Sequence, residues 1–174
     1  MYNRLMSPHR TCPARRRRVA LLISMAFAVL LTACDQREVE KVVKVTDVKT
    51  GWHDAGIING ENKIVPSVSF RLENVTSESI DGVQINAVFR QVTEGLAWGD
   101  RLIRGIGSDG LAGGATTPMH VVRGPRGFTS PLPRAEMFKH KQWVDVKVDL
   151  FARHGSRTWQ KLGEFPIERK LLIE

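Results

Sequence analysis

The segment PSVSFRLENVTSESIDGVQINAVFR, residues 66–90, contains the clearest structural pattern in this chain of 174 residues. Val68, Phe70 and Leu72 alternate with polar residues. The polar stretch NVTSES follows at residues 74–79, and the alternation resumes at residues 83–89. A period of two is typical of a strand that buries one face. Two such strands on either side of a polar turn predict an antiparallel hairpin with one buried face.

The flanking sequence predicts further strands. Residues 39–48 are expected to form a first strand, or else a short helix, and residues 49–63, KTGWHDAGIINGENK, are expected to form a loop because Gly, Asn and Asp are frequent there. Later strands are predicted at residues 96–106, 116–123 and 143–152, and a returning strand through Trp159 and Leu162. Pro166 makes residues 165–173 an edge strand or a bulged continuation.

These strands, with little helix between them, predict an all-β fold. About seven strands in one domain, residues 39–174, favour an antiparallel immunoglobulin-like β-sandwich. The domain is large enough to bury a core of its own. The two cysteines of the chain are Cys12 and Cys34, so we expect no disulfide inside the domain.

The N-terminal segment predicts export. Arg15 to Arg18 precede an apolar run that ends in Leu31-Thr32-Ala33-Cys34, which is the order of a signal peptide. The apolar run of about 15 residues would cover about 22 Å as a helix, short of the ~30 Å hydrocarbon core of a membrane. Residues 1–33 are therefore predicted to be a cleaved signal peptide. An ordinary secretory signal and an uncleaved anchor are the alternatives.

Leu-Thr-Ala-Cys at residues 31–34 resembles the lipobox of bacterial lipoproteins. The resemblance implies that Cys34 carries the lipid and that residues 34–38 form a short tether to the membrane. Asp35 resembles the signal for retention in the inner membrane of enterobacterial lipoproteins. We therefore expect a lipid anchor at the periplasmic face of the inner membrane, and a protein partner in the same membrane.

The net charge of +8 belongs mostly to the signal peptide. Residues 1–33 carry six arginines and no acid, which leaves 20 basic against 18 acidic residues, a net charge of +2, in the mature chain. A charge this small gives no reason to expect a nucleic-acid partner.

The segment GPRGFTSPLPRAEMFKHK, residues 124–141, is the best candidate for an interaction site. Basic side chains next to apolar ones suit anionic headgroups or an acidic protein surface. The alternative is a long connection whose aromatic residues pack under the sheet, with Pro133 opening one helical turn. The candidate contact residues are Arg123, Arg126, Phe128, Arg134, Phe138, Lys139 and Lys141.

No pattern in the sequence predicts catalysis. Residues 105–110 match G-x-G-x-x-G, but two more glycines and a proline follow where a dinucleotide site needs a helix. The mature histidines, His53, His120, His140 and His154, lack the spacing of metal ligands. We therefore expect no catalytic residues, no metal and no cofactor.

The pattern of residues 65–152 is similar to the immunoglobulin-like domains of exported bacterial proteins, including the FxLyD group. The resemblance implies a domain that binds other proteins or acts as a spacer. The sequence thus favours a membrane-anchored, non-catalytic interaction module, such as an accessory subunit of a membrane complex. The alternative is a lipoprotein that binds a small ligand or an envelope component, with a site near Trp52, Trp98 and the loop Gly105–Gly114; an enzyme is the least favoured interpretation.

Overall fold

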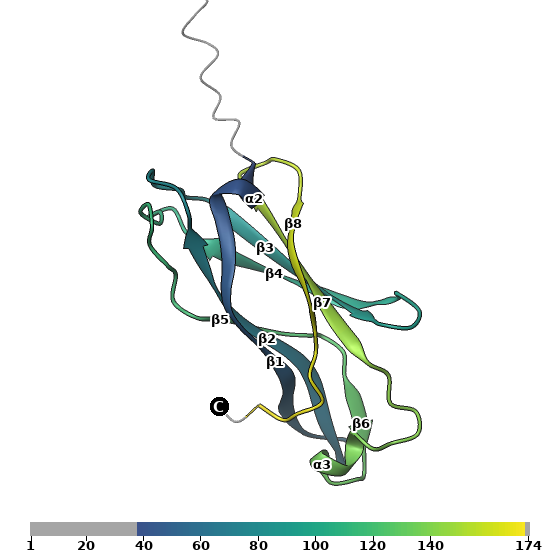
Figure 1. The fold of residues 1–174 in the computed structure, drawn as a ribbon. Coiled ribbons are helices and arrows are strands. Elements are labelled where there is room, and N and C mark those ends of the chain that lie inside the picture. The colour runs from purple at the N-terminus through teal and green to yellow at the C-terminus, as the bar shows by residue number, and fades with distance from the viewer. Residues whose placement is uncertain (1–37, 173–174) are drawn as a thin grey trace, which may run out of the picture. The chain divides into compact units, whose positions relative to one another are not determined.

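The computed structural model describes residues 38–172, which form two antiparallel sheets packed face to face (Figure 1). The prediction of an all-β antiparallel sandwich is confirmed. The elements are α2 (Val39–Val42), β1 (Val43–Ile58), β2 (Glu61–Asn74), β3 (Val83–Gln91), β4 (Ala97–Ile106), β5 (His120–Arg123), β6 (Phe128–Ser130), α3 (Arg134–Met137), β7 (Val146–His154) and β8 (Gln160–Pro166).

Each sheet has four strands. The first has the order β1-β2-β5, and β6 pairs with another part of β2. The second has the order β4-β3-β7-β8. Strands β4 and β8 are therefore the edges of the second sheet, and the apolar faces of both sheets meet in the core.

The predicted hairpin of residues 66–90 is wrong, because β2 and β3 lie in different sheets. The connection between them crosses the sandwich and is held by the buried amide of Asn74. Its Nδ2 donates hydrogen bonds to the carbonyls of Glu78 (2.7 Å) and Leu111 (2.9 Å), and its Oδ1 accepts one from the N–H of Thr76 (3.1 Å). The alternation shows only that each strand buries one face. Two neighbouring strands of one sheet and two strands that face each other across a core have the same alternation, so the pattern does not distinguish them.

The predicted loop at residues 49–63 is also wrong. Strand β1 continues to Ile58 and pairs with β2 as far as Ile58↔Glu61, and Asn59 and Gly60 form the two-residue turn. Both turn residues have positive φ, 54° and 83°, which is the conformation that Asn-Gly favours in tight hairpins. At the other end of β1 the expected strand 39–48 begins as the short helix α2 and becomes extended at Val43.

The remaining strands lie close to their predicted positions, except at the C-terminal end. Strand β8 ends at Pro166, and the chain then crosses to the first sheet. There the N–H of Trp52 donates to the carbonyl of Lys170, and the N–H of Leu172 donates to the carbonyl of Trp52, both at 2.8 Å. Residues 165–172, the described part of the predicted segment, therefore continue neither as one edge strand nor as a bulged strand, because residues 167–172 close the side of the sandwich between β8 and β1.

The core contains apolar side chains from both sheets and Trp52, which is 0% exposed. The largest fully buried side chains are Trp52, Phe70, Phe89, Ile64, Leu72, Ile85, Met137 and Leu150. Trp52 is on β1 but contacts aromatic rings from four other segments, so its burial depends on the whole fold rather than on one sheet.

We expect Trp52→Ala to lower the free energy of unfolding by about 3–5 kcal/mol, because truncation of a large buried aromatic residue leaves a cavity. Urea denaturation followed by circular dichroism measures this change. Trp159→Ala is the matched control, because the Trp159 ring is partly exposed and lies 4.7 Å from the guanidinium of Arg153. Its loss should cost about 1 kcal/mol or less. Equal losses in the two variants would contradict the central role of Trp52.

Candidate interaction surface

An aromatic cluster holds the 123–141 segment against the sandwich. Phe128 and Phe138 belong to this segment, and their rings lie 5.6 and 6.4 Å from the ring of Trp52. Trp143 stacks on Phe128 at 4.4 Å, and Trp98 of β4 lies 5.2 Å from Phe128. The two phenylalanines therefore pack inside the fold, as in the alternative interpretation of this segment.

An ion pair connects α3 to the first sheet. The Nε of Arg134 lies 2.5 Å from Oδ2 of Asp54 on β1. This guanidinium, helped by the N–H of Gly56, holds the pKa of the Asp54 carboxyl below its usual range. Pro133 precedes the helix, and its carbonyl accepts from the N–H groups of Glu136 and Met137. The predicted helical turn after Pro133 is present, and the charge of Arg134 is directed to Asp54.

A shallow depression of about 660 Å³ lies beside α3. Its lining residues are Leu132, Glu136, Lys139, His140, Lys141 and Gln142. Lys139 pairs with Glu136 at 3.1 Å, and Lys141 is exposed. The depression therefore presents an apolar side chain, Leu132, next to two ammonium groups.

The β1–β2 hairpin adjoins this depression. Ile57 lies opposite Asn62 on β2, and Asn62 lies opposite Ser130 on β6. The Nδ2 of Asn62 donates a hydrogen bond of 2.9 Å to the carbonyl of Leu132, which connects the hairpin to the depression. We call the combined area the distal surface; its residues are Ile57, Ile58, Leu132, Lys139 and Lys141.

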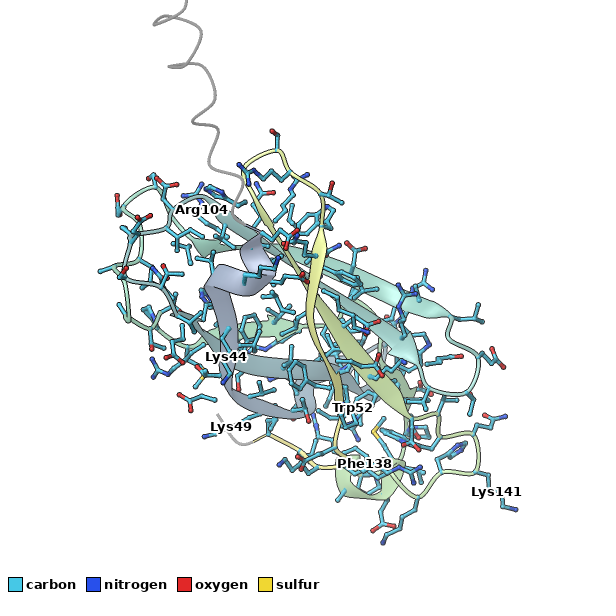
Figure 2. The ribbon with its side chains drawn as sticks, turned by 45° about the horizontal axis from the view of Figure 1, so that its top comes forward. Lys44, Lys49, Trp52, Arg104, Phe138 and Lys141 are labelled. Carbon is cyan, nitrogen blue, oxygen red and sulfur yellow. The ribbon has the colours of Figure 1, made fainter. Side chains whose placement is uncertain are left out.

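The distal surface is unusually apolar for a strand end. Ile57 is 67% exposed, and Ile58 and Leu132 are also exposed. Figure 1 shows that the β1–β2 turn, β6 and α3 lie at the end of the sandwich opposite α2. In Figure 2 Phe138 and Lys141 lie near this end, and Arg104 lies near the other.

The structure divides the predicted contact residues into separate groups. Phe128 and Phe138 are in the aromatic cluster, and Arg134 pairs with Asp54. Lys139 and Lys141 line the depression. Arg123, at the end of β5, and Arg126 are exposed along the path from β5 to β6.

Sequence reasoning missed the apolar half of the distal surface. Ile57 and Ile58 lie directly before Asn59-Gly60, and the prediction of a loop at residues 49–63 gives a candidate role to Trp52 but none to the two isoleucines. The Asn-Gly pair was the signal that could have placed both isoleucines at the tip of a hairpin.

The structure brings together only part of the alternative ligand site. Trp52 and Trp98 are in contact, with ring centres 6.4 Å apart. Trp98 and Gly105 are near opposite ends of β4, and seven residues of strand separate them by about 23 Å. The loop Gly105–Gly114 packs instead on the β2–β3 crossing, where Leu111 and Ile80 exchange backbone hydrogen bonds.

Cys34 and Asp35 lie outside the described residues, as do residues 1–33, for which a signal peptide is predicted. Within residues 38–172 no helix is long and apolar enough to cross a membrane. In the same range no group of three or more His, Cys, Asp or Glu side chains is placed to hold a metal ion.

No protein-family model matches the chain, and no curated protein matches it. A Northeast Structural Genomics Consortium target solved by X-ray crystallography is 10% identical, with a TM-score of 0.43 over 75% of this chain and 89% of the other. A protein from Arabidopsis thaliana, solved in solution, is 18% identical, with a TM-score of 0.38 over 76% of this chain and 83% of the other. Both likenesses are weak, and no function passes from either protein to this chain.

We expect Asp54→Asn to loosen α3 from β1. An exposed ion pair contributes at most about 1 kcal/mol, so protection of the Met137 amide against hydrogen exchange should fall by up to about fivefold at neutral pH. The lowered pKa of Asp54 means that the wild-type contact is complete above about pH 4 and is lost as the pH falls through the lowered value.

Asp47→Asn is the matched control, because Asp47 is another exposed β1 carboxylate and pairs with Arg71 at 3.4 Å. It should leave the protection of Met137 unchanged. If both variants reduced this protection equally, the Asp54–Arg134 contact would not be what positions α3.

Proposed function

We propose that this chain is an exported lipoprotein, held by lipid on Cys34 at the periplasmic face of the bacterial inner membrane. Its β-sandwich is a non-catalytic module that binds a protein of the same envelope through the distal surface. The lipobox-like sequence LTAC and the following Asp35 support the anchor and the location. The observation that carries the binding role is the exposed apolar tip beside Lys139 and Lys141.

The chemistry of the distal surface suits a protein partner. Exposed isoleucine and leucine side chains lose contact with water when a second surface covers them, which is favourable. The lysines at the rim favour an acidic neighbour and steer its approach. Apolar residues with a charged rim are the usual arrangement of a protein interface.

The distal surface is also held in place before any partner binds. The Asn62–Leu132 hydrogen bond, the Asp54–Arg134 ion pair and the packing of Phe128 and Phe138 each fix one part of it. A surface that is already ordered loses less conformational entropy on binding.

The position of the distal surface favours a protein over the headgroups beside the anchor. Strand β1 has 16 residues and connects the α2 end to the distal end. At about 3.3 Å per residue it reaches as far as about 50 Å. The anchor joins the domain at α2, so the lysines of the 123–141 segment are remote from the point of attachment.

We expect Cys34→Ala to move the protein from the membrane fraction to the soluble fraction, because stable attachment needs the acyl chains. Asp35→Ser should keep the protein in the membrane and shift it from the inner to the outer membrane. Membrane fractionation with an antibody to the domain measures both. Labelling with radioactive palmitate separates lipid from an uncleaved residue 1–33 segment: a wild-type protein that incorporates no palmitate would exclude lipid on this residue as the anchor.

We expect the double variant Lys139→Glu, Lys141→Glu to lose at least about tenfold of partner recovery in a crosslinking pull-down from intact cells, because two attractive charges become repulsive. Lys44→Glu, Lys49→Glu is the matched control: both lysines are exposed on β1 outside the distal surface, and the charge change is the same. Cys34→Ala run in parallel reports whether recovery needs the membrane.

A partner lost with the distal variant and kept with the control supports the proposal. Equal recovery with both variants would remove the distal surface from consideration. If no specific protein were recovered from the wild type, the interaction module would be the wrong function, and a ligand screen would replace it.

A further inference from the structure

Strand β4 is an edge strand with a regular central part. Within residues 38–172 it pairs on one side only, with β3. The pairs from Gly99↔Phe89 to Arg104↔Gln84 follow without interruption, and the register shifts lie outside them. An edge of this kind presents unpaired N–H and C=O groups to another strand.

The side chains on the outer face of this edge have an unusual order. Ile103 lies opposite the buried Ile85 and belongs to the core face, so Asp100, Leu102 and Arg104 share the solvent face. Leu102 is 56% exposed. Among the described residues, Asp100 and Arg104 form no ion pair, and four residues of strand hold them about 13 Å apart.

The order Asp, Leu, Arg is complementary to itself in an antiparallel arrangement. When Leu102 faces Leu102 of a second copy, Asp100 of each copy faces Arg104 of the other. Apolar pairs and opposite charges that lie directly across two strands are both stabilising. Other registers are less favourable. When one β4 strand slides by four residues along the other, Asp100 faces Asp100 for one direction of the slide and Arg104 faces Arg104 for the opposite direction, so like charges face each other.

We propose that β4 pairs with β4 of a second copy of this chain, with Leu102 on the twofold axis. The two second sheets then join into one sheet of eight strands, in the order β8-β7-β3-β4-β4-β3-β7-β8. The interface is isologous, so it closes with two copies. This pairing goes beyond the proposed function and does not require the lipid on Cys34.

The pairing leaves the distal surface uncovered. That surface is carried by β1, β2 and the segment from β6 to α3, which belong to the other sheet and its connections. The Ile106 end of β4 pairs with Val83 and the Trp98 end with the Phe89 region, so antiparallel pairing places opposite ends of the two domains side by side. Each dimer would then carry its two distal surfaces, and its two α2 ends, at opposite ends of the joined sheet, so two copies anchored in one membrane pair with their sheets lying along the membrane.

The test is thiol crosslinking of full-length Leu102→Cys in intact cells. The thiol crosslinker is a short one, which joins the two thiols introduced at position 102 when they lie directly opposite each other. It does not join them when the two strands are shifted by four residues, about 13 Å along the strand. Leu96→Cys is the matched control, because Leu96 is 58% exposed and precedes β4, far from the axis. The wild-type chain reports any dimer formed through Cys12 or Cys34. We expect a dimer of Leu102→Cys at least about tenfold above both controls, because opposed side chains lie about 5 Å apart.

Charge reversal in the Leu102→Cys background tests the register. Asp100→Arg places arginine opposite arginine twice and should reduce the dimer at least about fivefold. The further change Arg104→Asp restores two opposite-charge pairs and should restore the dimer. If Leu102→Cys crosslinked no better than Leu96→Cys, the pairing would be wrong. If the second charge reversal failed to restore the dimer, the proposed register would be wrong.

Discussion

The burial of Trp52 is the contact on which most of the tertiary structure depends. Its ring lies against Trp98 of β4, Phe128 of β6, and Phe138 and Trp143, which both come from the connection between α3 and β7. Its backbone also takes part, because the N–H and carbonyl of Trp52 hydrogen-bond to residues 170 and 172. One residue therefore connects both sheets, the 123–141 segment and the C-terminal crossing. Each aromatic ring buried here removes a large apolar area from water.

The same cluster explains why a basic segment rich in Gly and Pro has a defined conformation. Phe128 and Phe138 anchor its two halves, Arg134 pairs with Asp54, and Asp145 receives two hydrogen bonds from Arg169 at 2.7 and 2.8 Å next to Trp143. The strand β6 has 3 residues and the helix α3 has 4. Elements this short are not stable alone. Tertiary contacts supply their order, and the distal surface results from it.

The second sheet is stabilised differently, by polar contacts on its outer face. Asp149 of β7 is buried between Arg90 of β3 at 3.0 Å and Lys161 of β8 at 2.7 Å. Lys161 and Lys147 lower the pKa of Glu164 on β8 to about 2. These contacts connect β3, β7 and β8 and stop short of β4. Asp100, Leu102 and Arg104 on the outer face of β4 take no part in these contacts, and the proposed pairing with a second copy uses them. The distal surface is carried by the other sheet and its connections.

The sequence by itself determined which residues alternate, and therefore which strands have one buried face. Val68, Phe70 and Leu72 on β2, and Val146, Val148 and Leu150 on β7, are buried as their patterns predict. The sequence also contained the Asn59-Gly60 turn and the helical turn after Pro133. Only the tertiary structure decided which sheet each strand joins, because alternation is the same for a neighbour in one sheet and for a partner across the core. It also decided that Trp52 is a core residue, and that the Asn62–Leu132 hydrogen bond connects the hairpin that carries Ile57 and Ile58 to the depression lined by Lys139 and Lys141. The Trp52–Phe128 contact and the Asn62–Leu132 hydrogen bond join residues 76 and 70 positions apart, and no local pattern of side chains encodes such a separation.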